Sequence, residues 1–187
     1  VAQYYDFGMN LKGAVINLDN IVIMDSKVPE MPGYWDQGCG AFDIAVRDTL
    51  VVRNSQFINN THYSRDGFGH FCTYSGPQFS PVITFDNCLF ANNRTYGGTR
   101  DIDIFFCQSV DFINCTFANN SGSYPDYLLI GTNENRIINC IFSNNSNSYD
   151  IRTTAQTTIE NCLFSRSANM YRDYQDASLT WGDNNLT

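Results

Sequence analysis

A short asparagine-based motif recurs along the chain and constrains its fold more than any other feature. The block Asn-Cys-x-Phe-x-Asn-Asn occurs in full three times, and looser versions stand before and after it. Its first residues, the leading asparagines, are Asn20, Asn54, Asn87, Asn114, Asn139 and Asn161, at steps of 34, 33, 27, 25 and 22 residues. A period of about 20–50 residues is typical of solenoids. The uneven step predicts loops of different length between otherwise similar units.

Apolar residues alternate with other residues on both sides of each leading asparagine. In one repeat, Ile83 and Phe85 precede Asn87, and Cys88 and Phe90 follow it. Alternation with a period of two indicates β-strands, and its change of phase across the asparagine indicates a bend. Asparagine tolerates the left-handed backbone conformation that such a bend needs. Each repeat is therefore predicted to hold two short strands joined at its leading asparagine.

A third strand is indicated eleven residues before the leading asparagine, where Asp43, Asp103, Leu128 and Asp150 each stand between apolar neighbours. Three short strands in each repeat predict an all-β fold, a right-handed parallel β-helix of about six coils, with residues 1–187 as a single domain. Strands of neighbouring coils lie about 4.8 Å apart. Equivalent residues should therefore form ladders of cysteine, phenylalanine and asparagine. The leading asparagines, Asn114 among them, are expected to be buried in the bend.

The repeat resembles those of known β-helix proteins. The Asn-Cys-x-Phe-x-Asn-Asn block is similar to the repeats of the pectin-lyase-like superfamily, and its Phe-x-x-Asn part is similar to those of polymorphic outer-membrane proteins. Those proteins often add Gly-Gly-Ala-Ile, of which this chain has only loose versions at residues 38–42 and 97–102. The resemblance covers nearly the whole chain and implies the fold. It does not select a function, because the superfamily holds lyases, hydrolases, adhesins and structural fibres.

The resemblance also implies where an enzyme of this fold would keep its site. Such sites lie on the outer face around the first strand and use Asp, Arg, Lys or His, often with calcium. The catalytic candidates are Asp101, Asp103, Asp150 and Arg152. Carboxylates there can bind calcium or act as an acid–base pair on a glycosidic bond. Leu128 interrupts this column, so Asp103 and Asp150 should lie two coils apart, roughly 10 Å.

Two long segments, 27–38 and 61–70, leave equivalent corners of neighbouring coils and should lie together. Their candidate ligand-binding residues are Tyr34, Trp35, Tyr63 and His70, since exposed aromatic rings beside polar groups suit a sugar or a protein contact. The alternative is that these residues only cover the flank of the solenoid.

The chain has seven cysteines. It has no Cys-x-x-Cys and no histidine cluster, so no metal site is expected, although calcium is possible. The four ladder cysteines fit small core residues. Cys39 and Cys72 each stand fifteen residues before a leading asparagine and are the disulfide candidates. No other cofactor is expected.

Several asparagines stand in Asn-x-Ser/Thr sequons. Asn59, Asn119 and Asn144 occupy one repeat position that is predicted to lie on an outer turn, and Asn93 stands one residue further on. These four are the candidate N-glycosylation sites. The alternative is that they only form turns.

Charge and hydropathy restrict the possible partners. The net charge is −8 and no basic stripe occurs, which argues against nucleic acid. No apolar run reaches the ~20 residues of a membrane span. The sequence favours a non-enzymatic extracellular or cell-surface protein, structural or adhesive, that associates end to end as a segment or repeating unit of a surface filament. Two alternatives stay open: a polysaccharide lyase or glycoside hydrolase, and a carbohydrate-binding module.

Overall fold

The computed structural model describes residues 9–28, 42–62, 69–73, 81–96, 102–105, 107–122, 126–131, 134–146, 149–153, 156–165, 171–173 and 178–186. Within these ranges every regular element is a β-strand, and every pairing between these strands is parallel. The prediction of an all-β fold with stacked parallel strands is therefore confirmed, and the arrangement is consistent with a β-helix-like solenoid.

The largest sheet has twelve strands. It contains two long strands, β1 and β4, and from β4 it continues as two separate series of shorter strands. The first half of the long strand β4 pairs with β7 and its second half with β8, while β1 pairs along both halves of β4. The strands of this sheet are β1 (Met9–Asp19), β4 (Phe42–Arg53), β7 (Gly69–Thr73), β8 (Val82–Asp86), β11 (Ile102–Phe105), β12 (Ser109–Ile113), β15 (Asp126–Gly131), β16 (Glu134–Ile138), β18 (Tyr149–Thr153), β19 (Gln156–Glu160), β21 (Tyr171–Asp173) and β22 (Leu179–Trp181).

Two smaller sheets complete the β-structure. The six-stranded sheet consists of β2 (Val22–Met24), β5 (Gln56–Ile58), β9 (Leu89–Ala91), β13 (Thr116–Ala118), β17 (Ile141–Ser143) and β20 (Leu163–Phe164). The four-stranded sheet consists of β3 (Lys27–Val28), β6 (Thr61–His62), β10 (Arg94–Thr95) and β14 (Ser121–Gly122). These last strands were not predicted from the sequence, because two residues are too few to show an alternation.

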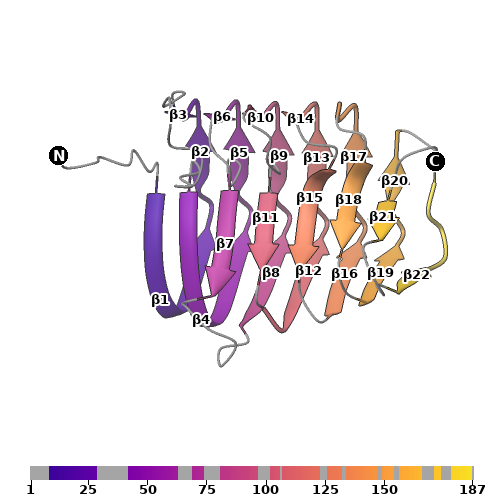
Figure 1. Ribbon diagram of the computed structural model, residues 1–187, viewed down its shortest axis with the longest axis horizontal. Helices are drawn as coiled ribbons and strands as arrows, with labels where there is room; N and C mark the ends of the chain where they lie inside the picture. The colour runs from indigo at the N-terminus through magenta and orange to yellow at the C-terminus, as the bar shows by residue number, and fades with distance from the viewer. Residues whose placement is uncertain are drawn as a thin grey trace.

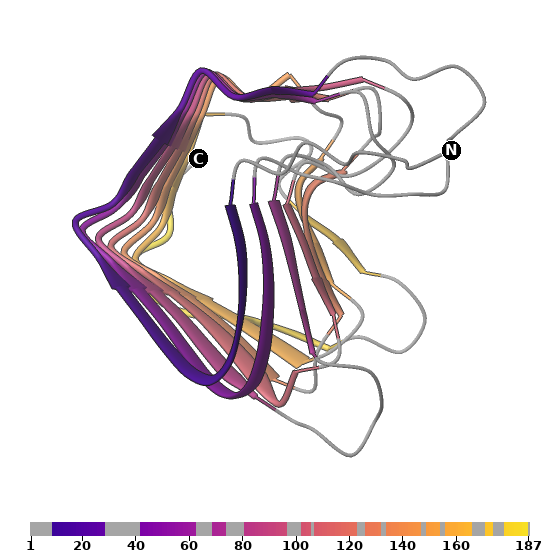
Figure 2. The same ribbon diagram turned by 90° about the vertical axis from the view of Figure 1, so that its left-hand side faces the viewer.

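Successive repeats lie side by side from β1 to β22 (Figure 1). Seen along the stack, the strands of successive repeats lie behind one another around a shared interior (Figure 2). The chain thus passes through the same sheets in turn, and each repeat packs on the one before it.

The bends form at asparagines, as the sequence predicts. The φ angle of the leading asparagines lies between 51° and 56°, in the left-handed region. A second asparagine five residues later has the same conformation in four repeats, at Asn59, Asn92, Asn119 and Asn144; we call these the turn asparagines. The two bends confine the strand between them to at most three residues.

Stacked aromatic rings fill the interior beside the six-stranded sheet. Phe57, Phe90, Phe117, Phe142 and Phe164 are at most 1% exposed, and their rings stack at centroid distances of 4.7 to 5.0 Å. The predicted cysteine ladder is also inside, since Cys88, Cys115, Cys140 and Cys162 are buried and carry free thiols.

The asparagine ladder inside the structure is not the one predicted. The leading asparagines are exposed, and the expectation that Asn114 is buried is wrong. A residue at a sharp bend between two strands projects away from the interior that both strands enclose. The buried ladder, here called the inner asparagines, consists of Asn60, Asn93, Asn120 and Asn145, six residues further on.

Hydrogen bonds between repeats satisfy each inner asparagine. The Asn120 side-chain amide donates to the Phe90 carbonyl at 2.9 Å and to Asn145 Oδ1 at 3.1 Å. Asn120 Oδ1 in turn accepts from the backbone N–H and the amide of Asn93, both at 3.0 Å. Buried polar groups destabilise a fold unless they are paired in this way. The ladder therefore fixes the register of neighbouring repeats.

Candidate functional site

The face formed by β4, β7, β11, β15, β18 and β21 is where the sequence placed its catalytic candidates. Backbone pairing puts Asp43, His70 and Asp103 at consecutive register positions on β4, β7 and β11. The same register continues through Leu129, Arg152 and Arg172. We call these six positions the outer column.

The outer column differs from its prediction in three ways. His70 was expected in the segment 61–70 away from this column and is its second position, while Leu129 replaces Leu128 and Arg152 replaces Asp150. The prediction assumed a constant offset of eleven residues from each leading asparagine. The segments between the first and second strands differ in length from repeat to repeat, so a constant offset fails.

Asp150 lies in the interior of the structure. Its side chain is 1% exposed, and its carboxylate accepts a hydrogen bond of 3.0 Å from the Asn145 side-chain amide. The expectation that it faces outward is therefore wrong. Arg152 is half-buried on the same strand. Asp101 lies outside the described residues.

The predicted ligand-binding residues are only partly described. Tyr34, Trp35 and Tyr63 lie outside the described residues, as does Cys39. The backbone places His70 and Cys72 on β7, with Cys72 between Ala45 and Phe105 in the register. Sugar binding by these loops and a Cys39–Cys72 disulfide stay predictions.

The sequons fall into two structural classes. Asn59, Asn119 and Asn144 are exposed turn asparagines. Asn93 is 0% exposed and belongs to the inner asparagines, where its amide donates to the Phe57 carbonyl at 3.0 Å. The structure therefore separates Asn93, one residue beyond the turn position, from the three exposed turn asparagines. Asn114, also in a sequon, is exposed instead.

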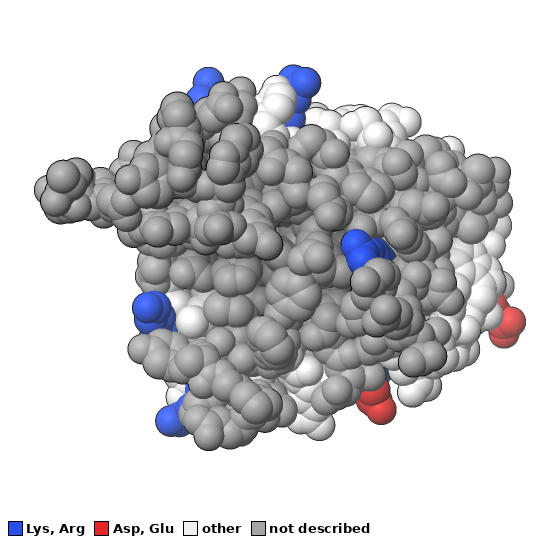
Figure 3. All heavy atoms as spheres, viewed as in Figure 1, with Lys and Arg blue, Asp and Glu red and all other residues white. Residues whose placement is uncertain are grey.

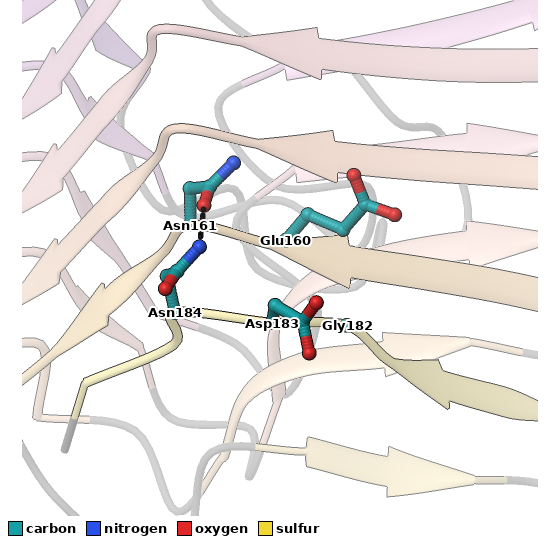
Figure 4. Close-up of a pocket in the computed structure, with 5 residues that line it drawn as sticks. All are labelled: Glu160, Asn161, Gly182, Asp183 and Asn184. Carbon is teal, nitrogen blue, oxygen red and sulfur yellow. Dashed lines mark hydrogen bonds between the residues drawn. The ribbon is translucent and has the colours of Figure 1, made fainter.

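A shallow pocket of about 340 Å³ lies at Asn161, the last leading asparagine, and Asn184, which has the same left-handed conformation. Figure 4 shows Asn184 donating to Asn161, at 3.0 Å, with the Glu160 and Asp183 carboxylates beside them on adjacent segments. Two carboxylates are few for a calcium site, which takes six to eight oxygen ligands. Among residues whose side chains are described, no group of three or more His, Cys, Asp or Glu could hold a metal ion.

A second pocket, of about 250 Å³, lies over β10 and β14. The Arg94 guanidinium lies 4.7 Å from the centre of the Tyr96 ring, and Ser121 and Ser146 line the same pocket. An arginine stacked on an aromatic ring beside hydroxyl groups forms a polar contact surface.

The six-stranded sheet presents a strip without charge. Its strands β2, β5, β9, β13, β17 and β20 contain no charged residue. Val22, Met24, Ile141 and Leu163 are 40 to 55% exposed on this strip. The leading and turn asparagines border it on either side. On the face shown in Figure 3, by contrast, charged side chains of described residues lie singly.

The strands β1 and β22, at opposite ends of the stack, each have one edge without a partner among the described strands. β1 pairs only with β4, and β22 pairs only with β19. Unpaired strand edges offer backbone N–H and C=O groups to another strand.

No protein-family model matches the chain, and neither does any curated protein or solved structure. Across the described residues, no helix is both long and apolar enough for a membrane crossing.

Proposed function

We propose that this protein is an extracellular or cell-surface β-solenoid with a structural or adhesive role. In this proposal the chain is a right-handed parallel β-helix of about six coils and a single domain, like the repeats of the pectin-lyase-like superfamily and of polymorphic outer-membrane proteins. The main support is that equivalent side chains stack through successive repeats, in the phenylalanine column and in the inner asparagines. Such stacking favours a stiff elongated body.

The outer surfaces suit contact with other molecules. The uncharged strip needs little desolvation of charge when it is covered, and its exposed aliphatic side chains gain from burial. The strands β1 and β22 belong to the same parallel sheet, and they occupy equivalent positions in the first and the last repeat. We propose that one copy pairs with the next through these edges, so that copies associate end to end in a surface filament.

Electron microscopy of the purified protein at near-neutral pH tests this role. Six coils at about 4.8 Å each predict filaments with an axial repeat of about 30 Å per copy. The matched variant is Asn17→Pro in β1. The Asn20 N–H donates to the Arg53 carbonyl of β4, and alternate residues of a parallel strand face the same neighbour, so the N–H of Asn17 lies on the free edge. Proline there removes a donor from that edge without removing a bond to β4. Discrete particles at every concentration would overturn the filament proposal.

Glycosylation is part of the proposal. Asn59, Asn119 and Asn144 sit at the same position of their repeats, so glycans on them would form one row beside the uncharged strip. Secretion from a eukaryotic host and mass spectrometry of the peptides should find these sites, and Asn114, occupied in the folded protein. Occupied Asn93 in soluble protein would contradict the buried position of this side chain, whose glycan would have no room.

A polysaccharide lyase or hydrolase is the second candidate, favoured by the acidic residues and histidine of the outer column. Cleavage of neutral and acidic polysaccharides, compared between the wild type and Asp103→Asn, tests it. Equal activity of the two proteins, or none in either, would argue against an enzyme that uses this column.

A further inference from the structure

The pocket over β10 and β14 lies on a column of exposed and half-buried residues in the four-stranded sheet. Each member stands two residues after the left-handed turn of its repeat. Strand pairing and backbone hydrogen bonds between repeats place the members side by side. In order along the stack they are Lys27, Thr61, Arg94, Ser121 and Ser146. Neighbouring parallel strands lie about 4.8 Å apart, so Ser121 is next to Arg94 and Ser146 is one repeat further on.

Arg94 stands between two residues of this column that carry a hydroxyl group, Thr61 and Ser121. Its guanidinium lies 4.7 Å from the centre of the Tyr96 ring. This cation–π contact helps to hold the charged group beside the pocket, which both residues line. Among the described side chains, no acidic group forms an ion pair with Arg94. No carboxylate of the described part of the chain therefore competes for its N–H groups.

The surroundings of Arg94 carry little negative charge, although the chain as a whole has a net charge of −8. The strands of the four-stranded and six-stranded sheets contain no Asp or Glu. Asp25, at the turn before Lys27, belongs to a repeat two steps away from that of Arg94. Asp150 is close to Ser146 in sequence, but its side chain is 1% exposed and lies inside. Charges more than about 8 Å apart are largely screened at physiological ionic strength, so the pocket is locally cationic.

These groups suit a sulfate monoester. The guanidinium donates two parallel N–H bonds to two oxygens of an oxyanion, and the Ser121 hydroxyl can donate to a third oxygen. A sulfate monoester offers three terminal oxygens and a single negative charge, which one arginine balances. A carboxylate has only two oxygens. A phosphate monoester carries a charge of about −1.5 to −2 at pH 7, and one arginine leaves part of it unbalanced.

Ser146 indicates what carries the sulfate. Its exposed hydroxyl lies one repeat beyond Ser121, too far along the column to share the sulfate with Arg94 but within reach of a neighbouring part of the same ligand. A sugar ring has hydroxyl groups there that can pair with it. The pocket, at about 250 Å³, is below the ~300–1,000 Å³ of pockets that enclose a whole ligand. This size fits recognition of one substituted sugar at the surface.

We propose that Arg94 and Ser121 bind the sulfate group of a sulfated sugar, and that Ser146 contacts a hydroxyl group of the sugar ring. The inference rests on the proposed adhesive role, for which it names the chemistry of the ligand. The filament contacts use the strand edges at the ends of the stack, whereas this pocket lies between them. Sugar binding can therefore fail while filaments form, and filaments can fail while the sugar binds.

NMR titration of the full chain with glucose 6-sulfate tests the site. The protein is made in a bacterial host that adds no N-glycans, so serine changes do not alter modification of the sequons that contain Ser121 and Ser146. The ligand should shift the backbone amide resonances of residues 94–96, 121 and 146, and unsubstituted glucose should shift none of them. The affinity should fall at least about tenfold in Arg94→Gln, because a hydrogen-bonded charged group is lost.

Arg47→Gln is the matched control. It removes the same charge at an exposed position of β4, where Arg47 pairs with Asp48 at 3.2 Å, and it should change the affinity by less than about twofold because distant charges are screened. Arg94→Lys keeps the charge but loses the planar fork, so it should also weaken binding. No shift in the wild type, equal affinity of wild type and Arg94→Gln, or an equal loss in Arg47→Gln would overturn the site.

Further ligands test which group is recognised. Glucose 6-phosphate and glucuronate should both bind more weakly than glucose 6-sulfate, and equal or tighter binding of either would overturn the choice of a sulfate ester. Methyl sulfate, which lacks the sugar, should bind equally to the wild type and to Ser146→Ala. Glucose 6-sulfate should bind more weakly to Ser146→Ala than to the wild type. Equal binding of glucose 6-sulfate to these two proteins would overturn the assignment of a sugar as the carrier.

Discussion

Replacing Phe90 by leucine should destabilise the fold more than the same change at Phe142, another member of the phenylalanine column. The Phe90 ring stacks on Phe57 at 4.7 Å and on Phe117 at 5.0 Å. It also meets Phe85 at 5.8 Å and Phe112 at 6.5 Å, edge to face. Phe90→Leu keeps an apolar side chain but removes all four ring pairs.

Phe142 is the matched control, because it is also 0% exposed and occupies the same position of its repeat. Its ring stacks on Phe117 at 4.7 Å and on Phe164 at 4.9 Å. An aromatic pair contributes about 0.5–1.5 kcal/mol beyond the burial of its area. Two lost pairs cost about 1–3 kcal/mol and four cost about 2–6 kcal/mol. The loss of apolar volume is the same in both variants and cancels in the comparison.

Urea unfolding followed by far-UV circular dichroism measures the difference. Phe90→Leu should lower the free energy of unfolding by about 1–3 kcal/mol more than Phe142→Leu. At an m-value of about 2 kcal/mol/M the two midpoints then differ by about 0.5–1.5 M. The m-values must agree, since a stack of repeats can unfold in parts. Equal midpoints, or a lower one for Phe142→Leu, would refute the idea that the edge-to-face contacts add to the stacked ones.

Three further predictions concern polar and ionisable groups. Asn120→Ala leaves the Phe90 carbonyl and the Asn93 N–H unpaired in the interior, which should cost about 3 kcal/mol in urea unfolding, whereas Asn119→Gly at the adjacent exposed turn should stay within about 0.5 kcal/mol. The hydrogen bond with the next thiol of the ladder, and then burial, raise the pKa of Cys88 above its ordinary value. Five cysteines are buried, so at most two of the seven should react with Ellman's reagent at pH 8 in the native protein; more would contradict the buried ladder. Because the pKa of Cys88 is raised in the folded state, its protonated thiol contributes to the stability of the fold below the ordinary thiol pKa of 9.0. This contribution falls as the pH rises above that value, so the urea midpoint should drop between pH 8 and pH 10. The two-pronged ion pair of Arg136 with Asp111 joins a mostly exposed side chain to a mostly buried one; a double-mutant cycle should give a coupling of about 1 kcal/mol that weakens in 1 M NaCl, and no coupling would show that solvent screens it fully.

The repeat was predictable because its determinants are local. An asparagine bend, a cysteine one residue later and a phenylalanine two residues after that all lie within four residues, so their relative positions cannot change between repeats. The left-handed bends and the buried Cys and Phe ladders follow from this spacing. Whether each asparagine side chain points into the interior or outward was harder to predict. Alternation counts residues along a strand, but it breaks at the bend itself, where Asn114 turns outward.

The signal for the buried asparagine ladder was present in the sequence but was assigned to the wrong residue. Each block ends in an Asn-Asn pair, and only its second member lies inside, as Asn60 and Asn120 do. The first member forms the turn, and the side chain of the residue after it points to the interior. The pair is therefore one exposed turn residue and one buried hydrogen-bonding residue, and Asn93 belongs to the second kind.

The outer column could not be predicted, because its members depend on loops of unequal length. His70 stands seventeen residues before its leading asparagine, whereas Asp43 and Asp103 stand eleven before theirs. No local motif joins these three residues. Only the pairing of β7 with β4 and β11 places the histidine between the two aspartates.

The contrast between repeated and unrepeated positions indicates where different functions can reside. The inner asparagines, the phenylalanine column and the uncharged strip recur from repeat to repeat, so they suit roles that extend along the body, such as stiffness and long contacts. Asp43, His70 and Asp103 form a combination of residue types that occurs once in the described register. Residue types at unrepeated positions of this kind are not set by a ladder. On the proposed function, the repeated surfaces are therefore the ones expected to serve assembly.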